Sequence, residues 1–262
     1  LHGAALVCKD WSKQMTDSLG FRKKFAVIAP STNTSVQPEY DDMRPYGVTN
    51  HFERIHIPDT KVFDDDSFME MINNIRNATM DSVDTAMTMD PDCVVMGMSA
   101  ETFWDGADGA ERLQKKMEEK TGGVPVVMGS HAVEAAIKAY GGIKKLGIVT
   151  PYAPVGDANV KRFFEDLGYE VVPIKGLASP SPMLIAHEPP QKLKHAAIEV
   201  SEGVDAIIQA GTNLAFGKVA TMAEFWLEKP VIAINTATYW HALRTNGIND
   251  RMPGFGHLLE NC

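Results

Sequence analysis

Four short polar turns in this sequence carry the hydroxyl and amide groups with which a protein can hold an organic anion. Each turn follows an apolar run typical of a buried strand, and α/β proteins place their sites at the carboxyl ends of parallel strands. Backbone N–H groups and Ser, Thr or Asn side chains at helix starts bind anions. Helix capping explains any single turn, but four at one sheet edge predict a site for a small carboxylate. The turns are PSTNT (30–34), MSAET (98–102), TPY (150–152) and GTN (211–213).

Two histidines are candidates for moving a proton at such a site. His131 follows the apolar run VPVVM and opens a predicted helix, so we expect it to point into the cleft. His187 falls in a predicted loop. Imidazole titrates near neutral pH, which suits general acid–base catalysis. A surface or capping role is the alternative for either histidine, and Glu101 is a further candidate base.

Strand-like runs alternate with helical patterns along most of the chain. The runs are short, rich in Val and Ile, and bounded by Gly, Pro or Asp, as buried parallel strands are. Residues 68–87 show apolar positions at the three- and four-residue steps of a helix. The alternation predicts an α/β fold whose parallel sheets are covered on both faces. The predicted strands are 24–30, 52–58, 92–98, 124–129, 145–151, 169–174, 205–211 and 229–235.

The two halves of the sequence resemble each other. KKFAVIAP (23–30) pairs with KKLGIVTP (144–151), and PDCVVMGMSAETF (91–103) pairs with VDAIIQAGTNLAF (204–216). The repeat predicts two similar Rossmann-like lobes with parallel sheets, related by pseudo-twofold symmetry, and a site in the cleft between them. Chance similarity between two doubly wound halves is the alternative. The predicted division is an N-terminal extension at 1–20, lobe one at 21–135 and 230–262, and lobe two at 136–229.

Composition and charge limit the classes of partner. The chain has 262 residues and a formal net charge of −9, which argues against nucleic acid or an anionic membrane surface as the main partner. No apolar run reaches the roughly 18 residues of a membrane-spanning helix. Three cysteines lie far apart, without the spacing of a metal site or a disulfide framework. We expect a reduced, cytoplasmic protein without a metal; its oligomeric state is open, with a homo-oligomer among the alternatives.

Six motifs together resemble the aspartate/glutamate racemase superfamily, and within it the branch of arylmalonate decarboxylases and maleate cis-trans isomerases. The resemblance runs from about Phe25 to Leu259, and the motifs fall in that family's order. It implies the two-lobed fold and chemistry on small carboxylic acids without any cofactor. The motifs are PSTNT (30–34), FERIHIP (52–58), GMSAETFWDG (97–106), VTPY (149–152), AGTNL (210–214) and NTATYWHALRTNGI (235–248).

The proteins that this sequence resembles carry one or two cysteines at the ends of matching strands in the two lobes. A thiolate there moves a proton or adds to a double bond. In this sequence Met98 occupies the first of these positions and Gly211 the second, so both thiols are missing. Cys93 stands near the start of its predicted strand, at the opposite end from the polar turns.

The residues that the resemblance assigns to anion binding are retained. Ser99 matches a hydroxyl that supports a carboxylate or enediolate oxygen, and Tyr152 matches a tyrosine that contacts substrate. Asn33 matches an amide that binds a carboxylate, while Thr212 and Asn213 would offer backbone N–H groups to a second carboxylate. Such preorganised donors often supply the largest catalytic effect. The remaining predicted substrate contacts are Thr34, Met98, Ala100 and Gly211.

We therefore expect a cofactor-independent enzyme that acts on a small carboxylate or dicarboxylate by a lyase-type reaction such as decarboxylation. Ser99 and Tyr152 would serve catalysis, and His131 or His187 would manage the proton. Three alternatives stay open. They are hydrolysis of a small amide or ester by a histidine-activated water, isomerisation as in maleate isomerase, and carboxylate binding without turnover.

Overall fold

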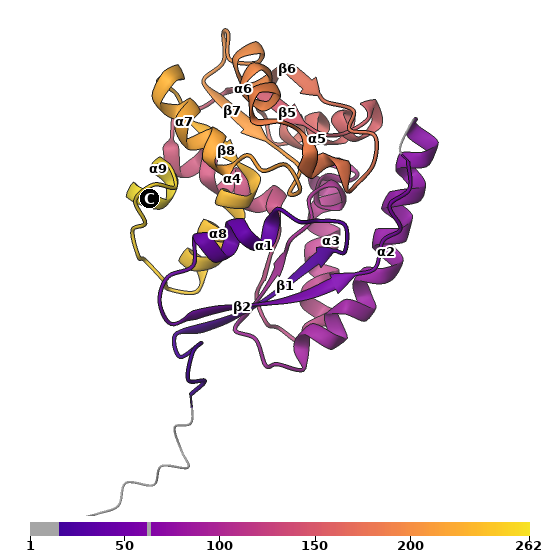
Figure 1. Cartoon of the computed structure of the whole chain (residues 1–262), viewed down its shortest axis with the longest axis vertical. Helices are drawn as coiled ribbons and strands as arrows, with labels where there is room; N and C mark the ends of the chain where they lie inside the picture. Colours follow the sequence, from indigo (N-terminus) through magenta and orange to yellow (C-terminus); the bar gives the residue numbers. More distant parts are fainter. Residues whose placement is uncertain (1–15, 62–63) are drawn as a thin grey trace, which may run out of the picture.

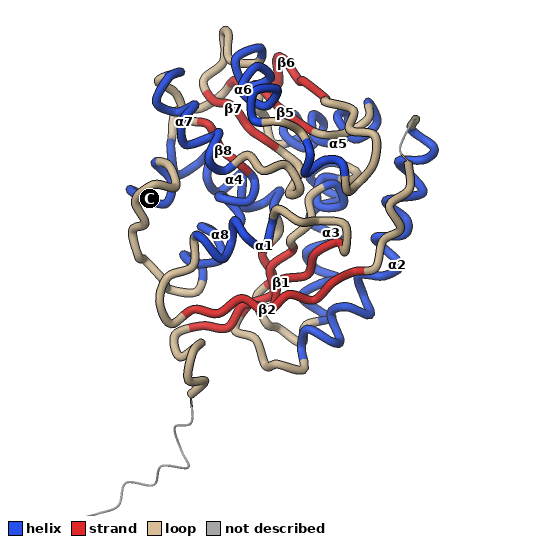
Figure 2. Tube along the Cα trace, in the orientation of Figure 1, coloured by secondary structure: helices blue, strands red, loops and turns tan. Residues whose placement is uncertain are grey.

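Two four-stranded parallel sheets form the centre of the structure, a computed structural model that describes residues 16–61 and 64–262 (Figures 1 and 2). The first sheet has the strand order β2-β1-β3-β4, and the second repeats it as β6-β5-β7-β8. The predicted α/β fold with two similar lobes is therefore confirmed. The strands are β1 (Lys23–Pro30), β2 (Val48–Ile55), β3 (Cys93–Met96), β4 (Val126–Val127), β5 (Lys145–Thr150), β6 (Glu170–Gly176), β7 (Ala206–Gln209) and β8 (Val231–Ala233).

Helices lie on both faces of each sheet, which is why the central strands read as continuous apolar runs. The side chains of 25–29 in β1 are completely or almost completely buried. The described helices are α1 (Val36–Asp42), α2 (Asp65–Met87), α3 (Gly106–Lys120), α4 (Gly129–Tyr140), α5 (Pro154–Asp166), α6 (Pro190–Glu199), α7 (Gly217–Leu227), α8 (Ile234–Thr245) and α9 (His257–Asn261), with the 3-10 helices η2 (Ala100–Phe103) and η3 (Leu184–His187).

Helix α2 shows how local sequence fixes an element that lines the site. Asp64 and Ser67 form a capping box in which each side chain bonds the other residue's backbone N–H. The helix then buries one apolar face, which includes Phe68, Met71 and Ile75, against the first sheet and the neighbouring helices.

The two lobes share a common hydrophobic core. One cluster of buried side chains contains Phe25 of β1 and Ile148 of β5, and α4 packs against α8 while α3 packs against α5. Strand β8 belongs to the second sheet, whereas α8, which follows it directly, contacts β3 and β4 of the first. The division of the chain at residues 135 and 229 stays a prediction.

Strand order also determines where a ligand can enter each lobe. The chain leaves β1 toward β2 on one side, and β3 lies on the other; β5 has the same relation to β6 and β7. A crevice opens at such a switch point, outside the carboxyl ends of the strands. The four polar turns follow β1, β3, β5 and β7, so the repeated topology brings them to these two crevices. None of the helices formed by the described residues combines the length and apolar character needed to cross a membrane.

Candidate active site

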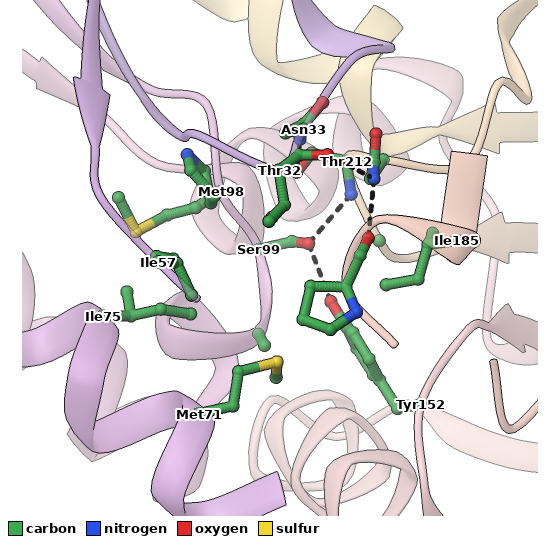
Figure 3. A pocket seen from close by; sticks show the side chains of 15 residues that line it. Thr32, Asn33, Ile57, Met71, Ile75, Met98, Ser99, Tyr152, Ile185 and Thr212 are labelled. Atoms are coloured by element: carbon green, nitrogen blue, oxygen red, sulfur yellow. Dashed lines mark hydrogen bonds between the residues drawn. The ribbon is translucent and has the colours of Figure 1, made fainter. Parts of the chain in front are cut away.

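The four polar turns meet at one cavity with a volume of about 60 Å³ (Figure 3). Met98 and Gly211, the two positions matched to cysteines, both line it, and Cys93 is not among the lining residues. Pockets for drug-sized ligands measure roughly 300–1,000 Å³, so this cavity suits a small molecule. Of the residues predicted to contact substrate, those that line it are Asn33, Met98, Ser99, Ala100, Tyr152, Gly211, Thr212 and Asn213.

The Ser99 hydroxyl is the polar centre of the cavity. Its Oγ lies 2.7 Å from the Tyr152 hydroxyl and accepts a hydrogen bond of 3.0 Å from the Thr212 backbone N–H (Figure 3). Ser99 follows β3 of the first lobe, while Tyr152 and Thr212 follow β5 and β7 of the second. All three residues are buried. Three hydrogen-bond donors from two lobes therefore meet within reach of one ligand oxygen.

Two side-chain amides hold the turn that carries Thr212 through its backbone carbonyls. Gln209 donates from Nε2 to the Gly211 carbonyl at 2.8 Å, and Asn235 donates from Nδ2 to the Thr212 carbonyl at 2.9 Å. Gly211 has φ of +111°, a backbone conformation that favours glycine. A Cβ atom there would lie 2.5 Å from Cδ of Pro151. The turn therefore excludes a side chain at 211 and directs the next N–H group at Ser99.

The side chains of Asn33 and Asn213 connect the two lobes, and their predicted contacts with a carboxylate, through the Asn33 amide and the Asn213 backbone N–H, stay a prediction. Asn33 donates to the Thr212 hydroxyl at 3.0 Å, and its Oδ1 accepts from two N–H groups at the start of α1. Asn213 Oδ1 accepts from the Thr34 N–H at 2.9 Å, while its Nδ2 donates to the Pro182 carbonyl at 2.8 Å. The bonds between Asn33 and Thr212 and between Asn213 and Thr34 each join residues 179 positions apart and connect the two lobes. Thr34 is exposed and is not among the lining residues.

The wall that faces Ser99 is apolar. Ile57 follows β2, and Met71 and Ile75 lie four residues apart on the buried face of α2 (Figure 3). Ile185 of η3 and Pro182 complete it from the second lobe. None of these residues was predicted from the sequence to contact a ligand, although the helical spacing of Met71 and Ile75 is present in it. A ligand with one anionic end and a small apolar substituent fits both walls.

Neither candidate histidine lines the cavity. His131 lies in the first turn of α4, and its ring centroid is 6.5 Å from that of Phe163 on α5. Burial lowers the pKa of this imidazole, so it is neutral at physiological pH. His187 ends η3 and is exposed, although Ile185, two residues earlier, reaches the cavity. The structure therefore does not bring His131 to the position that the sequence analysis expected.

Tyr152 is the only one of the fifteen lining residues with a titratable side chain. Burial raises the pKa of its hydroxyl, which keeps it protonated and able to donate. Glu101, the other candidate base, instead pairs with Arg76 at 2.7 Å, and burial raises the pKa of its carboxyl. Among the described residues, no group of three or more His, Cys, Asp or Glu side chains is arranged to hold a metal.

Cys93 is expected to be inert in the native protein. It is the first residue of β3 and is completely buried, and burial raises the pKa of its thiol to about 12. An aromatic disulfide reagent should therefore modify the half-buried Cys262 and leave Cys93 unmodified until the protein unfolds. Peptide mapping by mass spectrometry measures both, with Cys262→Ala as control. Native modification of Cys93 at the rate of Cys262, or its protection by malonate, would contradict the placement.

Comparison with known proteins gives one family. A sequence profile described as arylmalonate decarboxylase matches residues 26–259. A maleate isomerase of Alcaligenes faecalis is 28% identical over 151 residues, which are 57% of this chain and 59% of that protein. The match thus spans less than two thirds of the length of that curated relative.

Solved structures share the fold over almost their whole length. A maleate cis-trans isomerase of Nocardia farcinica with a covalently bound succinylcysteine intermediate has a TM-score of 0.81 and 19% identity, covering 92% of this chain and 99% of that one. The maleate isomerase of Pseudomonas putida S16, solved with maleate, has a TM-score of 0.80 and 23% identity, covering 92% and 98%. An arylmalonate decarboxylase has a TM-score of 0.71 and 18% identity, covering 90% and 98%.

Proposed function

This chain belongs to the arylmalonate decarboxylase family, and we propose on that basis that it is a cofactor-free decarboxylase of small malonate-type diacids. The observation that carries the proposal is the content of the cavity. Three donors meet at Ser99, and among the described residues those that line the cavity include no thiol, imidazole, ammonium or carboxylate.

Decarboxylation suits a cavity whose described lining residues offer hydroxyl groups but no general base to activate them. When one carboxylate leaves as carbon dioxide, the bonding electron pair moves into the retained carboxyl group and forms an enediolate. No C–H proton has to be removed first. Isomerisation through a covalent adduct needs an activated nucleophile, and two-base racemisation needs a base on each face of the carbon. The described residues that line this cavity supply neither a base that could activate a hydroxyl nor a pair of such bases.

In this mechanism the Ser99 hydroxyl, the Tyr152 hydroxyl and the Thr212 N–H hold the retained carboxylate. These groups form hydrogen bonds to one another in the structure. A carboxylate oxygen that enters between them would accept those hydrogen bonds instead. Negative charge on those oxygens rises as the enediolate forms, so the same bonds strengthen in the transition state. The apolar wall would receive the substituent on the central carbon.

Tyr152 is the proposed source of the proton that replaces carbon dioxide. Its hydroxyl stays protonated because burial raises its pKa, and an enediolate carbon is basic enough to take that proton. Water then restores the tyrosine. The net reaction consumes one proton and converts a malonate dianion into a monocarboxylate and carbon dioxide. This assignment replaces the predicted roles of His131 and His187, which lie outside the lining.

The test is to incubate the purified chain with malonate, methylmalonate and phenylmalonate and to measure carbon dioxide release. We expect turnover, with phenylmalonate the poorest substrate because the cavity is only about 60 Å³. Phenylmalonate as the best substrate would contradict the inference from cavity size. Absence of carbon dioxide from all three acids would overturn the decarboxylase proposal.

Maleate isomerisation is the second candidate function, favoured by the 28% identity to the Alcaligenes faecalis maleate isomerase. It would have to proceed without a thiol at 98 or 211. Conversion of maleate to fumarate, followed by NMR in the same preparations, distinguishes it. Thermal stabilisation by these acids with no turnover of any of them would instead indicate a carboxylate-binding protein.

A further inference from the structure

A half-buried carboxylate lies next to the turn that carries Tyr152. Asp157 is the fourth residue of α5, and its Oδ1 accepts a hydrogen bond from the hydroxyl of Thr150, the last residue of β5. The Thr150 oxygen in turn accepts from the Tyr152 backbone N–H at 3.1 Å. The Tyr152 hydroxyl then reaches Ser99 at 2.7 Å. Two hydrogen bonds thus connect Asp157 to the Tyr152 backbone, and the Tyr152 side chain extends from there to the polar centre of the cavity.

Two glycines leave the space that this arrangement needs. A Cβ atom on Gly176, at the end of β6, would lie 2.1 Å from Asp157 Oδ2, so the carboxylate packs directly on that backbone. A Cβ atom on Gly156 would lie 2.7 Å from Cβ of Tyr152. The Tyr152 ring also contacts Phe68 edge-on, with centroids 5.7 Å apart. Both ends of the series are therefore fixed by packing.

We propose that Asp157 is a positioning residue, whose carboxylate fixes the Thr150–Tyr152 turn and thereby holds the Tyr152 hydroxyl against Ser99. The inference rests on the proposed function for its effect on catalysis, but the positioning of Tyr152 can be measured without a substrate. Asp157 is not a catalytic residue, because it does not line the cavity.

The charged state of Asp157 should change within an accessible pH range. Burial raises the pKa of this carboxyl to about 6. Several charged groups on neighbouring elements have partners of their own: Asp65 of α2 accepts from the Val155 N–H, and Lys175 of β6 pairs with Glu199. The other ion pairs on or near α5 are Lys161–Glu165, Arg162–Asp166, Arg112–Asp105 and Lys192–Glu188. Tyr152 is protonated throughout this range.

The direction of the pH effect follows from the bond that Asp157 accepts. Above pH 6 the carboxylate accepts a charge-assisted bond from Thr150, roughly twice as strong as a neutral one. Below pH 6 the bond weakens and Tyr152 is held less firmly. The free energy of unfolding changes with pH in the opposite direction. The pKa of Asp157 is higher in the folded protein than in the unfolded chain, so protonated Asp157 stabilises the fold at low pH. This stabilisation is lost as pH rises through about 6. Such a cost is expected of a group that serves a site.

The experiment compares wild type with Asp157→Asn, Thr150→Val and Thr150→Ser. For wild type we expect kcat for the best diacid to fall about tenfold from pH 7.5 to pH 5 with an apparent pKa near 6. Asp157→Asn should lose this fall of kcat at acidic pH (the acidic limb of the profile) and should show the low kcat at both pH values. Thr150→Val should behave likewise, while Thr150→Ser should restore the limb. Glu165→Gln, at the exposed end of α5, is the matched control and should leave the profile unchanged.

A second measurement does not need turnover. In protein labelled with ¹³C at tyrosine Cζ, the Tyr152 resonance, assigned by its loss in Tyr152→Phe, should titrate near pH 6 in wild type and not in Asp157→Asn. If no acid is turned over but this titration is seen, the positioning role stands and only the proposed function fails. An acidic limb that persists in Asp157→Asn, or a Tyr152 resonance that does not titrate, overturns the proposal.

Discussion

Replacing Ser99 by alanine is expected to lower kcat for decarboxylation by about 100- to 1,000-fold, the effect of losing one donor from an oxyanion site. The Ser99 Oγ is the atom at which the Tyr152 hydroxyl and the Thr212 N–H converge, at 2.7 and 3.0 Å. Without it, the enediolate loses one donor outright and the other two lose their common partner. KM should change less than kcat, because the charge that these groups stabilise develops only in the transition state.

Ser130→Ala is the matched control for this substitution. Ser130 is as buried as Ser99, but its Oγ has no hydrogen-bond partner, and it lies in α4 away from the cavity lining. Removing an unpartnered buried hydroxyl should leave kcat unchanged and leave the free energy of unfolding unchanged or slightly increased. Equal kcat in wild type and Ser99→Ala, by steady-state kinetics on folded protein, would remove Ser99 from the mechanism.

The strands could be predicted from the sequence because each one is a short apolar run with clear boundaries. All eight predicted runs overlap the eight strands of the two sheets, and the repeated strand order follows the repeated motifs. Within each lobe the polar turns meet because parallel strands end at the same edge. Ser99 of the first lobe reaches Tyr152 and Thr212 of the second because the carboxyl ends of the two sheets also face one cavity, as the predicted cleft between the lobes requires.

The roles of individual side chains were less accessible, because they depend on partners that are distant in sequence. Asn33 was predicted to bind a carboxylate, and its bond to Thr212, which connects residues 179 positions apart, could not be predicted from the sequence. His131 stands at the expected place in the chain, one turn into α4, where the Phe163 ring of α5 packs near it. Neither the orientation of α4 nor its neighbour could be read from a single sequence.

The second large effect is expected on stability, from placing a cysteine at position 211. Gly211→Cys should lower the free energy of unfolding by about 2–5 kcal/mol: about 1–2 kcal/mol for left-handed backbone and about 1–3 kcal/mol for overpacking. The structural reasons are the φ of +111° and the 2.5 Å between a Cβ at 211 and Cδ of Pro151. Urea unfolding, with the midpoint compared at equal slope, measures the loss.

Two further variants separate the causes of this loss. Gly203→Ala carries only the backbone cost, because Gly203 has φ of +71° and a Cβ there would meet no atom within 4 Å. Pro151→Ala should recover part of the loss in a Gly211→Cys background, since it removes the Cδ and Cγ atoms that the new side chain meets. If Gly211→Cys costs no more than Gly203→Ala, Pro151 does not exclude a side chain at 211. If Gly211→Cys costs more than Gly203→Ala, the turn requires a residue without a side chain at 211. A thiol at that position of the cavity then requires a second substitution at Pro151.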